Sequence, residues 1–230
     1  MPTHREIYAS HALEYEQLVS HEDYEGNILR ALEGVVPLQG LEAVDLGTGT
    51  GRLAGLLAPH VKSIVALDVS VQMLRSAQAL LRGVASGPAL VAAAEHRRLP
   101  LRRASVDLLV SGWSVSYVAT WHPEQWRQNL EDWLREARRV LRKGGWIVLL
   151  ESLGTGNEAP ARLPHLADFY DWLSVSGFGY DWIRTDYRFE SPEAADALAG
   201  FFFGEEVTRR IKRTTPATLA ECTGVWSLQP

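Results

Sequence analysis

Three glycines at alternate positions, Gly47, Gly49 and Gly51, follow the carboxylate of Asp45 in the stretch EAVDLGTGTGRLAG, residues 42–55. A short apolar run ends just before the first glycine and an amphipathic run begins at the last one, which predicts a strand-to-helix turn. Glycine at such a turn lets a ligand approach the backbone closely. The first N–H groups of a helix lack partners and carry a positive partial charge. We therefore expect a polar or anionic group of a ligand to bind on this turn.

The spacing departs from the dinucleotide-binding pattern G-x-G-x-x-G, because Arg52 stands where the third glycine would be. Asp45 is poorly placed for a pyrophosphate and well placed for an ammonium group. The pattern D-x-G-x-G-x-G resembles motif I of the class I S-adenosylmethionine-dependent methyltransferases. The resemblance implies that Asp45 and the loop Gly47–Gly51, including Thr48, hold the aminocarboxypropyl end of S-adenosylmethionine. A glycine-rich turn that binds nothing is the alternative.

A second acid, Asp68, ends the next apolar run, SIVALD. An acid roughly 20 residues beyond the glycine loop is placed to accept both hydroxyls of a ribose. Its alternative role is to cap the following helix, which Ser70 can also do. Val69 and Met73 are assigned to the same cofactor pocket.

The turn after the third apolar run reads EHRRLPL. Glu95 and the segment 99–101 resemble the third motif of the same family, whose acid accepts from the adenine amino group. His96 is assigned to the pocket beside Glu95, although the spacer is longer than in the commonest form of the motif. A simple turn without a binding role is the alternative.

After the fourth apolar run, Ser111, Gly112 and Trp113 emerge where open α/β sheets bind ligands. They are predicted to face the adenosyl group, and a core position is equally consistent for Trp113. The helix LREARRVLRKGG also resembles the family's segment L-x-E-x-x-R-V-L-K-P-G-G, with Lys143 in place of the proline.

The acceptor side is less defined, and no catalytic residue is assigned. Tyr15 is predicted to close over the cofactor and Tyr8, Tyr117 and Glu151 to contact the acceptor, by resemblance to small-molecule methyltransferases or by position near strand ends. If the acceptor needs a base, the candidates are His11, His122, Glu151 and His165. Cys222 is predicted to pack in the last strand rather than to react.

These residues require a scaffold that brings strand ends together. Short apolar runs at 43–46, 63–68, 90–94, 106–111 and 146–151 alternate with helical patterns, which predicts a parallel sheet covered by helices. Residues 124–145 form the clearest helix, ending at Lys143 and Gly144, and Ser20 is a predicted cap for a helix over 21–35. By resemblance the fold is Rossmann-like and doubly wound, with a seven-stranded, mostly parallel sheet, the last strand antiparallel, and a C-terminal helical and aromatic insertion. We expect one methyltransferase domain over 1–230: an N-terminal helical cover (1–40), the cofactor-binding core (41–152), and C-terminal strands with a substrate cover (153–230).

The 230 residues are 46% apolar and 22% charged, as in soluble globular proteins. A net charge of −5 argues against nucleic acid as a partner, and a single cysteine excludes an internal disulfide framework. We expect a cytoplasmic protein with no membrane span and no metal site, and the oligomeric state is not indicated. The expected function is methyl transfer from S-adenosylmethionine to a small-molecule acceptor, with release of S-adenosylhomocysteine. A non-catalytic protein that binds these nucleosides and an NAD-linked oxidoreductase are the alternatives.

Overall fold

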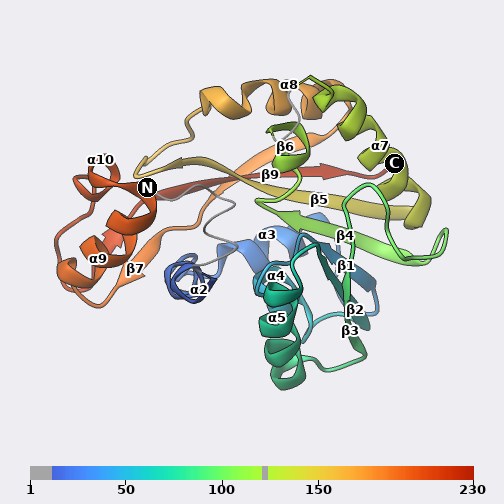
Figure 1. Cartoon of the computed structure of the whole chain (residues 1–230), viewed down its shortest axis with the longest axis horizontal. Coiled ribbons are helices and arrows are strands. Elements are labelled where there is room, and N and C mark those ends of the chain that lie inside the picture. The colour runs from blue at the N-terminus through green and yellow to red at the C-terminus, as the bar shows by residue number, and fades with distance from the viewer. Residues whose placement is uncertain (1–11, 121–123) are drawn as a thin grey trace. The chain divides into compact units, whose positions relative to one another are not determined.

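The central sheet is built from the short apolar runs that the sequence predicts as strands. In this computed structural model the neighbouring strands β3-β2-β1-β4-β5 pair in parallel, and the sheet continues through β9 and β6 (Figure 1). The seven-stranded, mostly parallel sheet confirms the predicted Rossmann-like α/β class. Its strands are β1 (Glu42–Leu46), β2 (Ser63–Asp68), β3 (Ala89–Ala93), β4 (Val106–Gly112), β5 (Leu141–Thr155), β6 (Gly179–Arg184) and β9 (Glu221–Leu228).

Helices connect β1 to β2, β2 to β3 and β4 to β5 because apolar residues recur there at helical spacing, whereas the chain from β3 to β4 forms no helix. In the longest, Trp133, Ala137 and Val140 form one fully buried face, while the arginines and glutamates lie mostly on the other faces. This confirms that the segment is helical, as predicted. The helices are α4 (Arg52–Leu57), α5 (Val71–Val84), α6 (Ser116–Thr120) and α7 (Trp126–Val140).

The structure describes residues 12–120 and 124–230, without the side chains of Ala12, Leu13 and Tyr15. The chain divides into two compact units. The larger unit comprises residues 31–151, 164–181 and 225–230 and includes η1 (Pro164–Leu166) and α8 (Ala167–Val175). The smaller unit comprises the residues up to Arg30, 152–163 and 182–224, and helix α3 (Asn27–Val35) passes from it into the larger one.

The smaller unit has an apolar core of its own. Leu18, Phe189, Ala195 and Leu219 are fully buried there, with Tyr187 stacked on Phe189. Its separate antiparallel pair, β7 and β8, is not foreseen from the sequence, which predicts only strands of the main sheet. The elements of this unit are α2 (Ala12–Ser20), β7 (Tyr187–Phe189), α9 (Pro192–Phe203), α10 (Glu205–Thr208) and β8 (Ala217–Leu219).

The predicted cap at Ser20 is wrong. Ser20 is the last residue of α2, and the next helix, α3, begins only at Asn27. Asp23 caps that helix: its two carboxylate oxygens accept from the N–H groups of Asn27 (2.7 Å) and Ile28 (3.0 Å). A carboxylate satisfies two of the unpaired N–H groups at a helix start, whereas a serine hydroxyl usually satisfies one.

The predicted end of α7 is also wrong, since the helix stops at Val140 rather than Lys143. Leu141 is buried and pairs with Val106 of β4, which draws the chain into the sheet. Arg142 then forms ion pairs with Asp107 (2.8 Å) and Glu42. Asp107 also accepts from the Glu42 N–H at 2.9 Å, which ties the start of β4 to the start of β1. Cys222 is buried in β9, as expected.

Among the helices of residues 12–120 and 124–230, none is long and apolar enough to cross a membrane.

Gly51→Ala tests the packing of the glycine turn. Gly51 has a φ of +98°, and a Cβ there would lie 2.9 Å from Ala77 Cα in α5. We expect the substitution to lower the free energy of unfolding by about 1–3 kcal/mol, measured by urea denaturation. The control is Gly83→Ala in α5, where a Cβ meets no atom within 4 Å, and which should be neutral or stabilising. A Gly51→Ala variant as stable as the control would contradict this packing.

Candidate functional site

Parallel pairing brings the carboxyl ends of four strands to one edge of the larger unit. Asp45 of β1 pairs with Val110 of β4, and Gly112 of β4 pairs with Leu150 of β5. Open α/β sheets bind their ligands at this edge. The predicted site residues gathered there from the strand ends are Asp45, Asp68, Ser111, Gly112 and Glu151.

Asp45 is a buried carboxylate with one oxygen satisfied and one not. Its Oδ2 accepts from the Thr48 hydroxyl (2.6 Å) and from the Ala54 N–H (3.0 Å). Its Oδ1 is buried without a hydrogen-bond partner in the described part of the chain. Burial raises the pKa of Asp45 to about 7, opposed by its two hydrogen bonds and aided by the nearby charge of Asp68. The carboxylate therefore lacks a cation or donor on one side.

Asp68 lies against the glycine loop, as the spacing predicts. Its Oδ2 accepts from the Gly49 N–H (2.9 Å) and its Oδ1 from the Ser70 N–H (2.8 Å). The Ser70 hydroxyl caps α5 by accepting from Met73 N (3.3 Å), so Asp68 is not needed as the cap. Each Asp68 oxygen keeps a lone pair for a further donor. Val69 is exposed beside it, whereas the Met73 side chain is buried.

The N–H groups of the glycine loop, which are expected from the sequence to bind a polar or anionic group of a ligand, form hydrogen bonds within the protein instead. Gly47 and Thr48 both donate to Leu67 O (2.7 and 2.9 Å), and Gly51 donates to Thr48 O (2.9 Å). These N–H groups, and that of Gly49, therefore already donate hydrogen bonds to acceptors within the protein. A Cβ on Gly49, by contrast, would meet nothing within 4 Å, so a ligand can approach the loop there.

Gly47 is covered by a residue that the sequence analysis did not single out. A Cβ on Gly47 would overlap the Ser114 hydroxyl, and that hydroxyl lies 2.9 Å from His96 Nε2. Burial lowers the pKa of His96 to about 4, so its ring is neutral at physiological pH. The only hint in the sequence is the position of Ser114 two residues beyond the end of β4.

Glu95 lies on the same turn as His96 but its carboxylate is half exposed and pairs with Arg97 Nε (2.5 Å). Its backbone carbonyl accepts from the Arg98 N–H (3.0 Å), which closes the turn. The adenine role and the simple turn role both remain compatible with this position.

At the end of β4, the Ser111 hydroxyl donates to Leu46 O at 2.5 Å and is fully buried. Gly112 packs closely on Leu53, where a Cβ would lie 2.7 Å from Cδ1. Trp113 is half buried and has a φ of +50°, which is strained for an aromatic residue. The Arg52 guanidinium lies 4.8 Å from its ring centroid, a cation–π distance.

Glu151, at the carboxyl edge in β5, is buried and accepts from the Ser116 N–H at 3.2 Å. Burial raises its pKa to about 7, and hydrogen bonds from Ser116 oppose the shift. Tyr117 is half buried on α6, the helix that follows Trp113. His165 is exposed in η1.

The remaining predicted residues cannot be placed. Tyr8, His11 and His122 lie outside the described residues, and Tyr15 belongs to α2 with its side chain also outside them. Within the described part of the chain, no group of three or more His, Cys, Asp or Glu side chains could hold a metal ion.

Asp45→Asn tests the unsatisfied carboxylate through stability. The folded protein binds the Asp45 proton more tightly than the unfolded chain, whose pKa is near 3.8. This carboxyl therefore lowers stability as pH rises from about 4 to about 7. At pH 8 we expect Asp45→Asn to unfold at a higher denaturant concentration than the wild type. Its free energy of unfolding should be larger by at most about 4 kcal/mol. The difference should vanish near pH 4, and a variant less stable than wild type at pH 8 would contradict the account.

A family model described as "Methyltransferase domain" matches residues 44–149. The chain is 29% identical over 180 residues to a malonyl-[acyl-carrier protein] O-methyltransferase of Marinomonas sp., covering 77% of this chain and 60% of that one. It is 34% identical over 122 residues to the ubiquinone/menaquinone biosynthesis C-methyltransferase UbiE of Rubrivivax gelatinosus, covering 53% and 43%. The chain thus spans at most 60% of the length of these relatives.

The fold resembles the crystal structure of a SAM-dependent methyltransferase from Aquifex aeolicus, with a TM-score of 0.53, 17% identity and coverage of 86% of this chain and 87% of that one. The matched model spans the motifs from β1 to β5, including Asp45, the glycine loop and Asp68. Residues 44–149 thus match a methyltransferase domain, and the chain is similar in sequence to curated methyltransferases and in fold to a SAM-dependent methyltransferase.

Proposed function

We propose that this chain transfers a methyl group from S-adenosylmethionine to a small-molecule acceptor by in-line displacement. The observation that carries the proposal is the buried Asp45 Oδ1, which has no hydrogen-bond partner among the described residues. An ammonium group supplies the positive charge and donors that such an oxygen lacks. The open approach to Gly49 and the remaining lone pairs of Asp68 also suit the amino acid and ribose parts of the cofactor.

In this proposal the residues of the chain bind and orient the cofactor and the acceptor, and they do not activate the methyl group. Asp45 would hold the ammonium group and Asp68 the ribose hydroxyls, each by charge-assisted hydrogen bonds. Trp113 and Tyr117 would form the wall on the acceptor side and exclude water. When bound, S-adenosylmethionine supplies a methyl group already activated by its sulfonium. Holding the acceptor in line with that methyl group contributes up to about 7–11 kcal/mol to lowering the barrier.

Glu151 is the favoured candidate for handling a proton of the acceptor. It is buried at the same edge, and its pKa of about 7 allows both protonation states near neutral pH. As a carboxylate it would accept a hydrogen bond or proton from an acidic oxygen or carbon acceptor. His165 is less favoured because it is exposed.

The acceptor is proposed only as a class. Two matched relatives are named as a malonyl-[acyl-carrier protein] O-methyltransferase and a ubiquinone/menaquinone biosynthesis C-methyltransferase, so both O- and C-acceptors are candidates here. We also propose one methyltransferase domain, with residues 1–40 and 153–230 as covers, in a cytoplasmic, reducing compartment, which the single buried cysteine suits.

Calorimetry with S-adenosylmethionine and S-adenosylhomocysteine, followed by transfer of labelled methyl to a panel of malonyl thioesters and quinols, tests the proposal. Binding together with transfer supports it. Binding with no transfer to the panel or to a cell extract would favour a non-catalytic binding protein. Tighter binding of NADH than of S-adenosylmethionine would favour an oxidoreductase.

Asp68→Ala should weaken the binding of S-adenosylhomocysteine at least tenfold, about 1.4 kcal/mol, because the ribose hydroxyls lose their charged acceptor. Asp68 also accepts two backbone N–H groups, so Asp68→Asn, which keeps an acceptor oxygen, serves as the milder control and should lose less. Calorimetric titration measures both. A folded Asp68→Ala variant with an unchanged dissociation constant would remove the ribose assignment.

Glu151→Gln should lower kcat/KM for the identified acceptor at least tenfold while changing the dissociation constant of S-adenosylhomocysteine less than twofold. The reason is that the amide keeps the hydrogen bond from Ser116 but cannot take a proton. The wild-type rate should fall as pH drops below about 7, and the variant should lose this dependence. An unchanged pH profile in the variant would exclude Glu151 from the proton transfer.

A further inference from the structure

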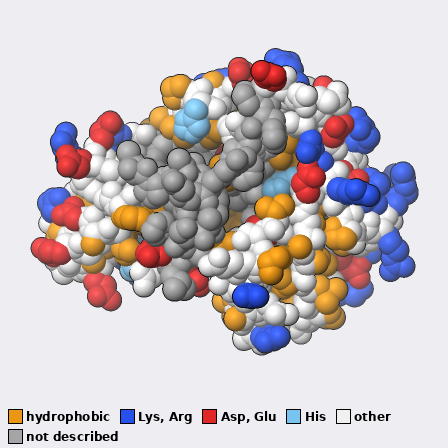
Figure 2. Space-filling view, viewed as in Figure 1, with side chains coloured by type: hydrophobic (Ala, Val, Ile, Leu, Met, Phe, Trp, Pro, Cys, Tyr) orange, Lys and Arg blue, Asp and Glu red, His pale blue; other side chains and the backbone are white. Residues whose placement is uncertain are grey.

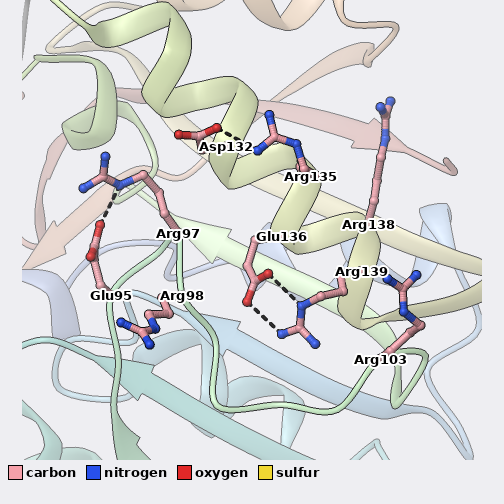
Figure 3. Close-up of a pocket in the computed structure, with 9 residues that line it drawn as sticks. All are labelled: Glu95, Arg97, Arg98, Arg103, Asp132, Arg135, Glu136, Arg138 and Arg139. Atoms are coloured by element: carbon pink, nitrogen blue, oxygen red, sulfur yellow. Dashed lines mark hydrogen bonds and ion pairs between the residues drawn. The ribbon is translucent and has the colours of Figure 1, made fainter.

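An arginine-rich groove lies between α7 and the chain that joins β3 to β4, within the larger unit. Its volume is about 590 Å³, and all nine residues that line it are charged. Figure 2 shows basic side chains gathered on the side of the molecule where α7 and the start of β4 lie in Figure 1. We call this cavity the arginine groove. Its lining, drawn in Figure 3, is Glu95, Arg97, Arg98, Arg103, Asp132, Arg135, Glu136, Arg138 and Arg139.

Three ion pairs build the frame of the groove and use all three of its carboxylates. One lies on the turn after β3 and two lie along α7 (Figure 3). The pairs are Arg97–Glu95 at 2.5 Å, Arg135–Asp132 at 2.9 Å and Arg139–Glu136 at 2.7 Å.

The last of these pairs also fastens the two walls together. Glu136 Oε1 accepts from the Leu99 N–H (2.8 Å), and Arg139 donates to Leu101 O (2.8 Å) and Leu99 O (3.2 Å). Hydrogen bonds thus join α7 to the loop at several points. The groove is therefore a fixed feature of the surface, which lowers the entropic cost of docking on it.

The side chains of Arg98, Arg103 and Arg138 form no hydrogen bond or ion pair with the described residues, and all three residues are exposed. The lining therefore has three more positive than negative charges, on a chain whose net charge is −5. Three guanidinium groups without carboxylates in one groove repel one another and attract anions. A guanidinium matches a carboxylate with two parallel hydrogen bonds, so each of the three can pair with one side chain of an acidic partner.

The composition of the lining distinguishes between kinds of anion. A small-molecule site is lined mainly by apolar and aromatic residues, and no residue that lines this groove is apolar. A nucleic acid presents phosphates without interruption, which the interleaved carboxylates of Glu95, Asp132 and Glu136 and the net charge of the chain oppose. An acidic protein surface carries discrete carboxylates that can meet the three arginines and avoid the three acids.

We propose that the arginine groove is a docking surface for an acidic segment of a partner protein, held by Arg98, Arg103 and Arg138. The groove begins at Glu95, the residue before His96, so the docked partner lies beside the carboxyl edge of the sheet. This function is separate from cofactor binding and does not depend on the nature of the methyl acceptor.

The test uses the full chain and a fluorescein-labelled helical peptide bearing six glutamates, with binding followed by fluorescence anisotropy at low and high salt. The groove variant combines Arg98→Gln, Arg103→Gln and Arg138→Gln. The matched control combines Arg75→Gln, Arg82→Gln and Lys143→Gln, which are exposed outside the groove and remove the same charge. Thermal melting verifies that both variants are folded. Amide chemical shifts of the wild type locate the bound peptide.

We expect the groove variant to weaken peptide binding at least tenfold and the control less than twofold, with salt weakening the wild type. Shifted amides should cluster in residues 95–103 and α7. Equal losses in the two variants, or shifts elsewhere, would overturn the proposal. It would also be overturned if a seven-nucleotide single-stranded oligothymidylate bound more tightly than the peptide and lost its binding in the groove variant.

Discussion

A buried carboxylate with one unsatisfied oxygen is the constraint on which the site depends. Asp45 points into the turn after β1, where Thr48 and Ala54 satisfy only Oδ2. Burying a polar atom without a partner costs about 1–3 kcal/mol, and the raised pKa of Asp45 reflects the same cost. A cationic group that donates a hydrogen bond to this oxygen removes the cost, and it therefore binds more tightly. Relief of this destabilisation in the folded protein would thus contribute to the free energy of binding the ammonium end of the cofactor.

The rest of the larger unit positions that carboxylate. Parallel pairing of β1, β2 and β4 sets Asp45 beside Asp68 and beside the end of β4. The hydrogen bond from Gly49 to Asp68 links the glycine loop to the second acid. Glu136 and Arg139 of α7 form hydrogen bonds with Leu99 and Leu101 and so hold the loop that carries Glu95 and His96. Glu136 and Arg139, which belong to the helix segment that resembles the family motif, thus have a structural role. The same contacts frame the arginine groove.

Much of this arrangement is predictable because it follows from spacing. Two acids at the ends of neighbouring parallel strands must meet at one edge, so the proximity of Asp45 and Asp68 is confirmed. Ser114 is missed because its contact with Gly47 depends on the path of the chain after β4. The internal use of the loop N–H groups is missed for a similar reason, since it depends on the carbonyl of Leu67 in a neighbouring strand. The same limit explains the wrong end of α7, where pairing with β4 overrides helical propensity.

Proton release on ligand binding tests the central role of Asp45 most directly. Calorimetry of S-adenosylhomocysteine binding at pH 6, in buffers with different ionisation enthalpies, measures it. An ammonium group against Asp45 requires the carboxyl, protonated at that pH, to ionise, so the account predicts release of about one proton. Adenosine, which lacks the ammonium group, should release none, and neither ligand should release any from Asp45→Asn. Binding of S-adenosylhomocysteine without proton release by the wild type would contradict the account.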